Sequence, residues 1–409
     1  MSRILMAWEL GGGLGHTVPL SQIAAALLDG GHEVHIALRD LSTAHGAFGA
    51  LARRPGLHLW QAPLWLPTLR GLPEAATYAE LLYRAGYLDP TRLLGLVRAW
   101  RSLYDTLRPD FLLVDHAPTA LLAARGLPFA KATMGTGFFQ PPPQRPIPPF
   151  RVWERIDPRR VEQAEDKVLA TVNTVLDTLE QGPMGALSQL VAVDENFLLT
   201  WREVDHFSAR AADPATRYWG LLPTASHGEP AQWPDGDTPK VFAYLKGEYG
   251  PVEGVLKGLR EASVRTVAYV PQLPPEVAKR VASPRLQLSP KPLDMASVCA
   301  QADAVVCNAG SGTVCTVLQA GIPVVLLPMH AEQLLFSIRV AEAGAGAWLT
   351  ETDAREKTGR TLNRILREPG FRDAVRALSD RYRPDRDRNV AVEVAARIGA
   401  LAQRPGGSP

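Results

Sequence analysis

The chain has 409 residues, 46% of them hydrophobic and 21% charged, with a formal net charge of +2 at pH 7. This length exceeds what a single core supports, so we expect two domains. The balanced charge argues against nucleic acid as a partner, and no apolar run is long enough to cross a bilayer. Because the N-terminus lacks a signal-peptide pattern, we expect a cytoplasmic protein, with membrane contact possible but not expected.

The N-terminal half alternates strands and helices, which predicts a parallel α/β sheet. The expected strands are residues 3–8, 33–38, 57–61, 111–115, 129–133 and 196–200, and the expected helices are residues 17–28, 73–107 and 150–190. A glycine turn at residues 11–15 closes the first strand, and a proline-rich surface loop is predicted at 140–151. Residues 1–222 are therefore expected to form the first domain.

The C-terminal half repeats this alternation after a Pro- and Gly-rich linker predicted at residues 223–239. The expected strands are residues 241–245, 265–269, 286–288, 304–307 and 324–327. Residues 240–385 would form a second Rossmann-like domain. Residues 386–409 would supply a last helix that packs back on the first domain.

A small-residue turn joins the expected strand at 304–307 to the helix that follows it. The turn contains Gly310, Ser311, Gly312 and Thr313. A helix that begins in such a turn presents unpaired backbone N–H groups and the positive end of its dipole, which suits a phosphate. The sequence therefore predicts an anionic, nucleotide-linked ligand.

The stretch from residue 308 to residue 333 resembles the donor-binding signature of family 1 (UDP-glycosyltransferase-like) glycosyltransferases of the GT-B fold. In that family a strand leads into His-x-Gly-x-Gly-Thr, a helix, Ala-Gly-Val-Pro, a second strand, and an acidic residue followed by Gln. The matching positions are Gly310, Gly312, Thr313, Gly321, Pro323, Glu332 and Gln333. Asn308 replaces the family's phosphate-contacting His; its amide can donate a hydrogen bond but carries no charge. The resemblance implies two Rossmann-like domains facing across a cleft.

The resemblance also implies donor-side roles. Residues 310–313, assisted by Asn308, would hold the diphosphate of a nucleotide sugar, and Glu332 with Gln333 would bind hydroxyls of a hexose. Lys291 and Pro292 would lie at the nucleotide base, with UDP and dTDP both open. A solvated helix start is the alternative for the Glu332–Gln333 pair.

His16 is the candidate general base, since Gly15, His16 and Pro19 resemble the family's Gly-His-x-x-Pro motif. A neutral imidazole can accept a proton from an acceptor hydroxyl at neutral pH. Asp115, at the end of a predicted strand, would orient it. The alternatives are a helix-capping histidine and a loop-capping aspartate; His116 is interpreted as a bystander. The glycine turn also resembles a dinucleotide fingerprint, but its spacing differs from G-x-G-x-x-G.

An inverting transfer to a largely apolar or aromatic small-molecule acceptor follows from the resemblance. Neither a cofactor nor a metal is expected, and Cys299, Cys307 and Cys315 lack metal-ligand spacing. The expected acceptor-side residues are Gly13, Leu14, Tyr83, Phe138 and Phe139. Two other functions stay open: transfer to a membrane lipid carrier, and binding of a nucleotide sugar without catalysis.

Overall fold

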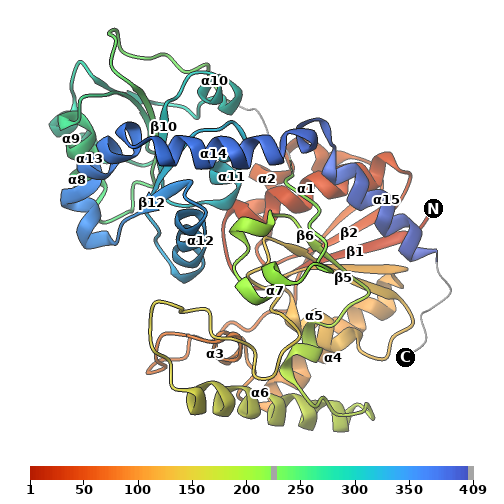
Figure 1. Ribbon diagram of the computed structural model, residues 1–409. Coiled ribbons are helices and arrows are strands. Elements are labelled where there is room, and N and C mark those ends of the chain that lie inside the picture. The colour runs from red at the N-terminus through yellow and green to blue at the C-terminus, as the bar shows by residue number, and fades with distance from the viewer. Residues whose placement is uncertain (223–227, 404–409) are drawn as a thin grey trace. The chain divides into compact units, whose positions relative to one another are not determined.

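In the computed structural model, which describes residues 1–222 and 228–403, the chain divides into two compact units (Figure 1). One unit comprises Met1–Leu222 with Asn389–Pro409, and the other comprises Pro223–Arg388. Each unit contains one six-stranded parallel sheet. The expected fold class, two Rossmann-like α/β sheets, is confirmed.

The first sheet has the strand order β3-β2-β1-β4-β5-β6. Its strands are β1 Arg3–Trp8, β2 Glu33–Leu38, β3 Leu57–Gln61, β4 Phe111–Asp115, β5 Ala130–Gly135 and β6 Glu195–Leu198. The helices of this unit are α1 Leu14–Asp29, α2 Ala44–Phe48, α3 Tyr78–Tyr83, α4 Pro90–Leu107, α5 Pro118–Ala124, α6 Pro158–Thr178, α7 Ser208–Ala212 and α15 Val390–Ala402. The order reverses between β1 and β4, so the carboxyl ends of these neighbours form the switch point where doubly wound sheets bind ligands.

The second sheet repeats this topology with the order β12-β11-β10-β7-β8-β9. Its strands are β7 Lys240–Tyr244, β8 Arg265–Tyr269, β9 Leu286–Ser289, β10 Ala304–Cys307, β11 Val324–Leu326 and β12 Gly346–Trp348. Its helices are α8 Val252–Glu261, α9 Pro275–Val281, α10 Met295–Cys299, α11 Ser311–Gln319, α12 Ala331–Glu342, α13 Glu351–Arg367 and α14 Pro369–Arg381. Here the switch point lies between β7 and β10.

Short 3-10 helices complete the description: η1 Leu41–Thr43, η2 Gly49–Arg53, η3 Leu187–Val191, η4 Arg202–Val204 and η5 Arg383–Asp387. None of them belongs to either sheet.

The first sheet is buried on both faces because its strands are almost wholly apolar. Leu5 and Ala7 of β1 belong to one hydrophobic cluster, while Ile4, Met6 and Trp8 belong to another. This alternation follows from the period of two along a strand. Helix α15 joins the second of these clusters together with α1, so the last described helix packs on the first unit. Each of the two faces of the first sheet is therefore covered by its own hydrophobic cluster.

Several predicted elements differ from the observed ones. The single helix predicted at 73–107 is two helices, α3 and α4, because Asp89 caps a new helix that begins with Pro90. Only Pro158–Thr178 of the helix predicted at 150–190 is α-helical. The three-residue strand β12 was not predicted. Within the proline-rich segment, Ile147 and Phe150 are buried, so it is not simply a surface loop.

The predicted linker at 223–239 is described only in part, since residues 223–227 lie outside the described residues. Its remainder pairs with the second unit. Glu229 forms a parallel bridge with Leu293, and the Ala231 N–H donates to the Ser297 hydroxyl at 2.9 Å. These bonds hold residues 229–231 beside α10.

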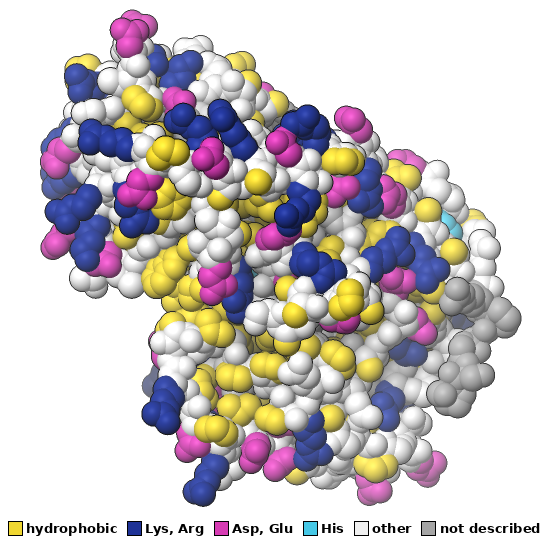
Figure 2. Space-filling view, in the orientation of Figure 1, with side chains coloured by type: hydrophobic (Ala, Val, Ile, Leu, Met, Phe, Trp, Pro, Cys, Tyr) yellow, Lys and Arg dark blue, Asp and Glu magenta, His cyan; other side chains and the backbone are white. Residues whose placement is uncertain are grey.

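The visible face of the second unit carries basic and acidic side chains interspersed (Figure 2). Helix α13 shows the pattern in detail, with Asp353 and Lys357 forming an ion pair at 2.8 Å one helical turn apart. Mixed charge of this kind solvates a surface without creating a field of one sign.

Candidate active site

His16 and Asp115 meet at the switch point of the first sheet. His16 is the third residue of α1, and Asp115 is the last residue of β4. The imidazole Nδ1 lies 3.0 Å from Asp115 Oδ2, and the two side chains are 13% and 6% exposed. When the carboxylate accepts the Nδ1–H, the neutral ring has its unprotonated nitrogen at Nε2. This is the arrangement of a base oriented by a carboxylate.

The glycine turn allows the imidazole to approach the backbone. Gly11 has a φ of +88°, and a Cβ atom at this position would lie 2.4 Å from His16 Nε2. Trp8 stacks on the imidazole with ring centroids 5.3 Å apart, and Phe139 lies at 5.9 Å. A side chain at position 11 would displace the ring, so the glycine is required by sterics as well as by its φ.

The residues expected on the acceptor side lie in different environments. Phe139 is partly buried and borders the dyad. Phe138, by contrast, is 5% exposed and packs on Phe150 at 5.1 Å, so its ring is a core element with little surface for a ligand. The Tyr83 hydroxyl donates to the Ala164 carbonyl at 3.4 Å, which ties α3 to α6. Of these three side chains, Phe139 is therefore the one whose ring lies beside the His16 imidazole.

The other two acceptor-side candidates belong to the glycine turn. Gly13 is the N-cap of α1 and has a φ of +80°. The backbone of Leu14 starts α1, whereas its side chain lies outside what the structure describes.

The turn at 308–313 leads from β10 into α11. Gly310 is the N-cap of α11, and no side chain caps this nine-residue helix. A Cβ atom added at Gly310 or at Gly312 would meet nothing within 4 Å, so open space adjoins the first turn, which also contains Ser311 and Thr313. Uncapped N–H groups beside open space, at the positive end of a helix dipole, suit an anion.

Asn308 has a structural role that the sequence did not indicate. Its side chain is buried, its Oδ1 accepts the Lys246 N–H at 2.8 Å, and its Nδ2 donates to the Leu327 carbonyl at 2.9 Å. The amide thus joins the segments that follow β7 and β11 to the end of β10. These bonds use Oδ1 and one of the two Nδ2 hydrogens, so the phosphate contact expected for Asn308 stays a prediction.

The remaining donor-side candidates lie at two further places in the second unit. Glu332 and Gln333 are in the first turn of α12, partly buried, and Gln333 Oε1 accepts the Met329 N–H at 2.8 Å. The exposed Lys291 forms an ion pair with Glu229 at 2.6 Å, and the Pro292 carbonyl accepts the Glu229 N–H at 3.0 Å. Glu229 is therefore a neighbour of the expected base segment that the sequence did not indicate.

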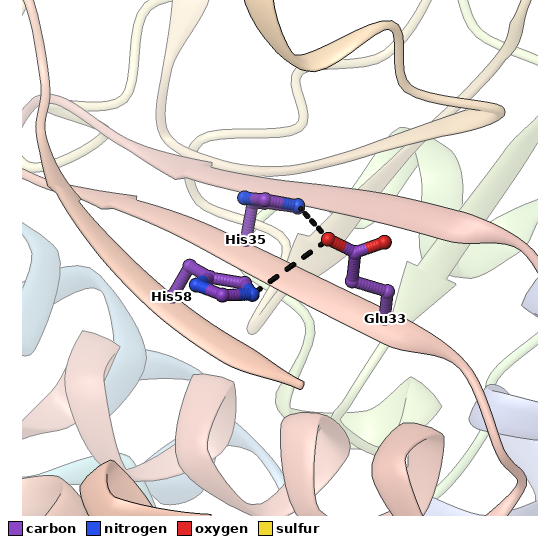
Figure 3. Close-up of side chains that lie close together, drawn as sticks. All are labelled: Glu33, His35 and His58. Atoms are coloured by element: carbon purple, nitrogen blue, oxygen red, sulfur yellow. Dashed lines mark hydrogen bonds and ion pairs between the residues drawn. The ribbon is translucent and has the colours of Figure 1, made fainter. Parts of the chain in front are cut away.

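Glu33, His35 and His58 form a cluster with metal-ligand chemistry on β2 and β3 (Figure 3). His35 Nε2 lies 3.0 Å from Glu33 Oε1, and His58 Nε2 lies 3.6 Å from the same oxygen. However, the Trp60 indole N–H donates to His35 Nδ1 at 3.0 Å. Indole is only a donor, so neutral His35 carries its proton on Nε2 and has no lone pair there for a metal. The cluster is better described as a hydrogen-bonded group.

A buried carboxyl, Glu9, follows β1 and was missed from the sequence. It accepts the backbone N–H groups of Thr119 and Ala120 at 3.1 and 2.7 Å. Burial raises the pKa of Glu9 to about 7, against the lowering effect of these hydrogen bonds. No local signal marks the residue, because its partners lie more than a hundred positions away.

Two Rossmann-like parallel sheets, one with a histidine–carboxylate pair at its switch point and the other with an uncapped helix start at the equivalent place, define the GT-B architecture. Residues 289–400 match the family model described as erythromycin biosynthesis protein CIII-like, C-terminal domain. The C-terminal third of the chain thus carries this domain, and the resemblance to family 1 glycosyltransferases is confirmed.

Curated relatives and solved structures agree with this assignment. The elloramycin glycosyltransferase ElmGT of Streptomyces olivaceus is 36% identical over 104 residues, 25% of each chain. A PGL/p-HBAD biosynthesis rhamnosyltransferase of Mycobacterium bovis (strain BCG / Pasteur 1173P2) is 25% identical over 335 residues, 77% of this chain and 73% of that protein. The spinosyn rhamnosyltransferase SpnG superposes with a TM-score of 0.65 at 18% identity, covering 99% of this chain and 100% of SpnG, which shows the common fold. Several curated relatives, ElmGT among them, are matched over a quarter of their length or less.

Within residues 1–222 and 228–403, no helix combines the length and the apolar character that crossing a membrane would require.

Proposed function

We propose that the chain is an inverting glycosyltransferase that moves a hexose from a nucleoside diphosphate sugar to a hydroxyl of a small, largely apolar acceptor. The observation that carries this proposal is the 3.0 Å contact between His16 Nδ1 and Asp115 Oδ2. A carboxylate on Nδ1 presents the basic Nε2 to a hydroxyl and stabilises the imidazolium that forms when the proton is taken.

In the proposed reaction His16 Nε2 removes the proton of the acceptor hydroxyl, and the oxygen of that hydroxyl attacks the anomeric carbon of the sugar. The bond from that carbon to the diphosphate breaks, and the negative charge that develops on the diphosphate is met by the N–H groups at the start of α11. A single displacement of this kind inverts the anomeric configuration. Asn308 holds the turn before α11 in place, and Glu332 with Gln333 would contact the sugar.

Named relatives support the donor and acceptor classes. SpnG has been solved with thymidine diphosphate and with spinosyn aglycone, and VinC has been solved with dTDP. On this basis we propose a UDP- or dTDP-linked sugar as the donor. In the first unit, Leu66 and Val152 are 82% and 51% exposed, and apolar side chains appear on the visible face near α3 (Figure 2). Such surface is suited to an apolar acceptor.

The catalytic assignment is tested by His16→Ala. We expect transfer to an aromatic hydroxyl acceptor, followed by mass spectrometry, to slow by about 10²–10⁴-fold, the usual contribution of a general base. His58→Ala is the matched control, since His58 belongs to the separate cluster on β2 and β3 and should retain full activity. If the His16 variant transfers sugar at the wild-type rate, His16 is not the general base and the catalytic assignment is wrong.

The donor assignment is tested by Gly312→Asp. Both Gly312 and Gly370 occupy the second position of a helix, and a Cβ atom added at either one would meet nothing within 4 Å, so Gly370→Asp in α14 is the matched control. An aspartate near a helix N-terminus is itself favourable, so neither variant should lose stability. Repulsion of the diphosphate should weaken binding of UDP or dTDP to the Gly312 variant by roughly 10- to 100-fold in calorimetry. If the two variants bind UDP or dTDP with equal affinity, the start of α11 is not the diphosphate site.

A further inference from the structure

His116 is a buried histidine whose ring nitrogens have no partner in the part of the chain that the structure describes. It follows Asp115 directly, is 7% exposed, and has a φ of +45°. Neither Nδ1 nor Nε2 forms a hydrogen bond of normal geometry with a described residue, although the Leu10 backbone acts on the ring in the direction that raises its pKa. Burial, followed by the charge of His16, lowers the pKa of His116 well below its ordinary value, so the ring is neutral. A neutral ring has one N–H donor and one acceptor nitrogen, and leaving both unused is costly.

Gln140 presents a second buried polar atom without a partner among the described residues. The Thr133 hydroxyl donates its hydrogen to Asn196 Oδ1 at 2.6 Å and therefore must accept from Gln140 Nε2, which lies 2.7 Å away. This network fixes the orientation of the carboxamide. The Gln140 Oε1 atom is left without a hydrogen-bond donor from residues 1–222 or 228–403, and Gln140 is only 5% exposed.

These two residues line one small cavity beside the dyad. Its wall includes Tyr78, Thr133 and Phe139, and its volume of about 10 Å³ suits one oxygen-sized group. Phe139 stacks on His116 with centroids 3.4 Å apart and also lies 5.9 Å from His16. A Cβ atom built on Gly135 would lie 3.6 Å from Gln140 Oε1 and 3.8 Å from Asp115 Oδ1. The cavity therefore adjoins the proposed catalytic pair.

A buried ion pair holds the loop that carries Phe139 and Gln140. Arg210 donates to Asp205 through Nε at 2.8 Å, and it also donates to the carbonyls of Gly137 and Gln140. Gly137 has a φ of +99°, and a Cβ atom there would lie 2.3 Å from the guanidinium. The loop is thus fixed before any ligand arrives, as a recognition site requires.

From these observations we infer that His116 and Gln140 form a binding site for a second hydroxyl group of the acceptor, distinct from the hydroxyl that receives the sugar. This inference rests on the proposed function. A hydroxyl can accept the His116 N–H and donate to Gln140 Oε1 at the same time, so it satisfies both residues. A carbonyl oxygen can accept from His116 but leaves Gln140 Oε1 without a donor, and a hydrogen atom satisfies neither.

The test compares flat acceptors that differ in one group. Binding of naphthols, hydroxytetralones and the isomers of dihydroxynaphthalene is measured by calorimetry without donor, and transfer to each is measured separately with donor present. We expect at least one dihydroxynaphthalene isomer to bind roughly tenfold or more tightly than the naphthol that lacks only its second hydroxyl. The affinity of the hydroxytetralone, which has a carbonyl in place of that hydroxyl, should lie between these two values. The ratio between the dihydroxy and monohydroxy probes is the readout, because a merely structural role would not change it.

Two variants change the polar groups of the site, one at each residue. Gln140→Met removes the carboxamide with little change of volume, and His116→Asn replaces the ring nitrogens by a shorter carboxamide while retaining a residue type that tolerates a positive φ. In both we expect the binding ratio to fall to within about threefold, as expected when a buried hydrogen bond is lost. Gln61→Met, a glutamine at the end of β3, should keep the wild-type ratio.

The outcomes separate this inference from the proposed function. If the wild-type protein shows no preference for a second hydroxyl, or if both variants keep that preference, the cavity holds only a water molecule and the inference is refuted. If transfer occurs without the preference, the proposed function stands alone. If the preference appears in binding while no sugar is transferred to any acceptor, the site is real and the proposed catalysis is wrong.

Discussion

Replacing Arg210 should cost more stability than replacing any neighbouring arginine, because its partner Asp205 is a buried carboxylate. The Asp205 side chain is 0% exposed and that of Arg210 is 9% exposed. Arg210→Met would leave this carboxylate with the Tyr218 hydroxyl at 2.6 Å and the Phe207 N–H at 2.9 Å. Breaking one side of a buried ion pair costs roughly 3–5 kcal/mol. The carbonyls of Gly137 and Gln140 would lose a donor as well.

Chemical denaturation followed by tryptophan fluorescence measures this loss. The matched control is Arg202→Met, since Arg202 donates to the Asp213 carbonyl at 2.8 Å and the Thr216 carbonyl at 3.1 Å in the same unit. Those hydrogen bonds, together with a third to the Ala211 carbonyl, go to neutral acceptors from a partly exposed side chain, so Arg202→Met leaves no buried charge behind and should lose less stability than Arg210→Met. Adding Asp205→Asn to Arg210→Met should recover part of the loss, because it removes the unpaired charge.

A loss below about 1 kcal/mol for Arg210→Met would contradict this reasoning, since it lies in the range of an exposed pair. So would a double variant that is no more stable than Arg210→Met. Arg210→Lys should recover part of the stability but not the placement of the 137–140 loop, because lysine lacks the planar fork. The KM for the acceptor should therefore rise in that variant more than kcat falls.

Three further predictions concern single residues. Asp115→Asn should lower kcat at least roughly 100-fold while the donor KM is unchanged, because an amide can hold His16 in the wrong tautomer; an equal rise of donor KM would point to a structural role. For Glu9, the folded pKa of about 7 exceeds the unfolded value of 4.5, so this carboxyl reduces stability as pH rises from 4.5 to 7. The unfolding free energy of Glu9→Gln minus that of the wild type should therefore increase by about 3 kcal/mol between pH 4 and pH 8, and parallel pH profiles would contradict this. Asn308→Ala should lower the unfolding free energy by about 1–3 kcal/mol, because the buried Leu327 carbonyl and the partly buried Lys246 N–H lose their partner; unchanged stability with weaker donor binding would instead favour a direct phosphate contact.

The fold was largely predictable because its signals are local. Strands such as β4 are short apolar runs bounded by turn residues. The bounds predicted for β4 from the sequence, residues 111–115, are those observed in the structure. Misassignments occurred where the pattern is ambiguous. The apolar periodicity of residues 73–107 continues across the break between α3 and α4, and the three residues of β12 are too few to show a period.

The candidate site was predictable where a single segment contributes it. The turn at 308–313 and the position of His16 follow a strand in the chain, and the carboxyl ends of parallel strands are binding positions in any such sheet. The pairing of His16 with Asp115 was expected for the same reason, since β1 and β4 are neighbours. In these cases chain order and sheet topology together bring the groups to one edge.

Tertiary structure alone decided how the remaining polar groups are used. The sequence presents Asn308 as a phosphate ligand, His116 as a bystander and Arg210 as one arginine among many. Only the folded chain shows that Asn308 bonds two backbone segments, that His116 and Gln140 share a cavity, and that Arg210 holds the loop around them. The reason is physical: hydrophobic periodicity records which face of an element is buried, whereas a hydrogen bond depends on distances between atoms that are remote in the chain.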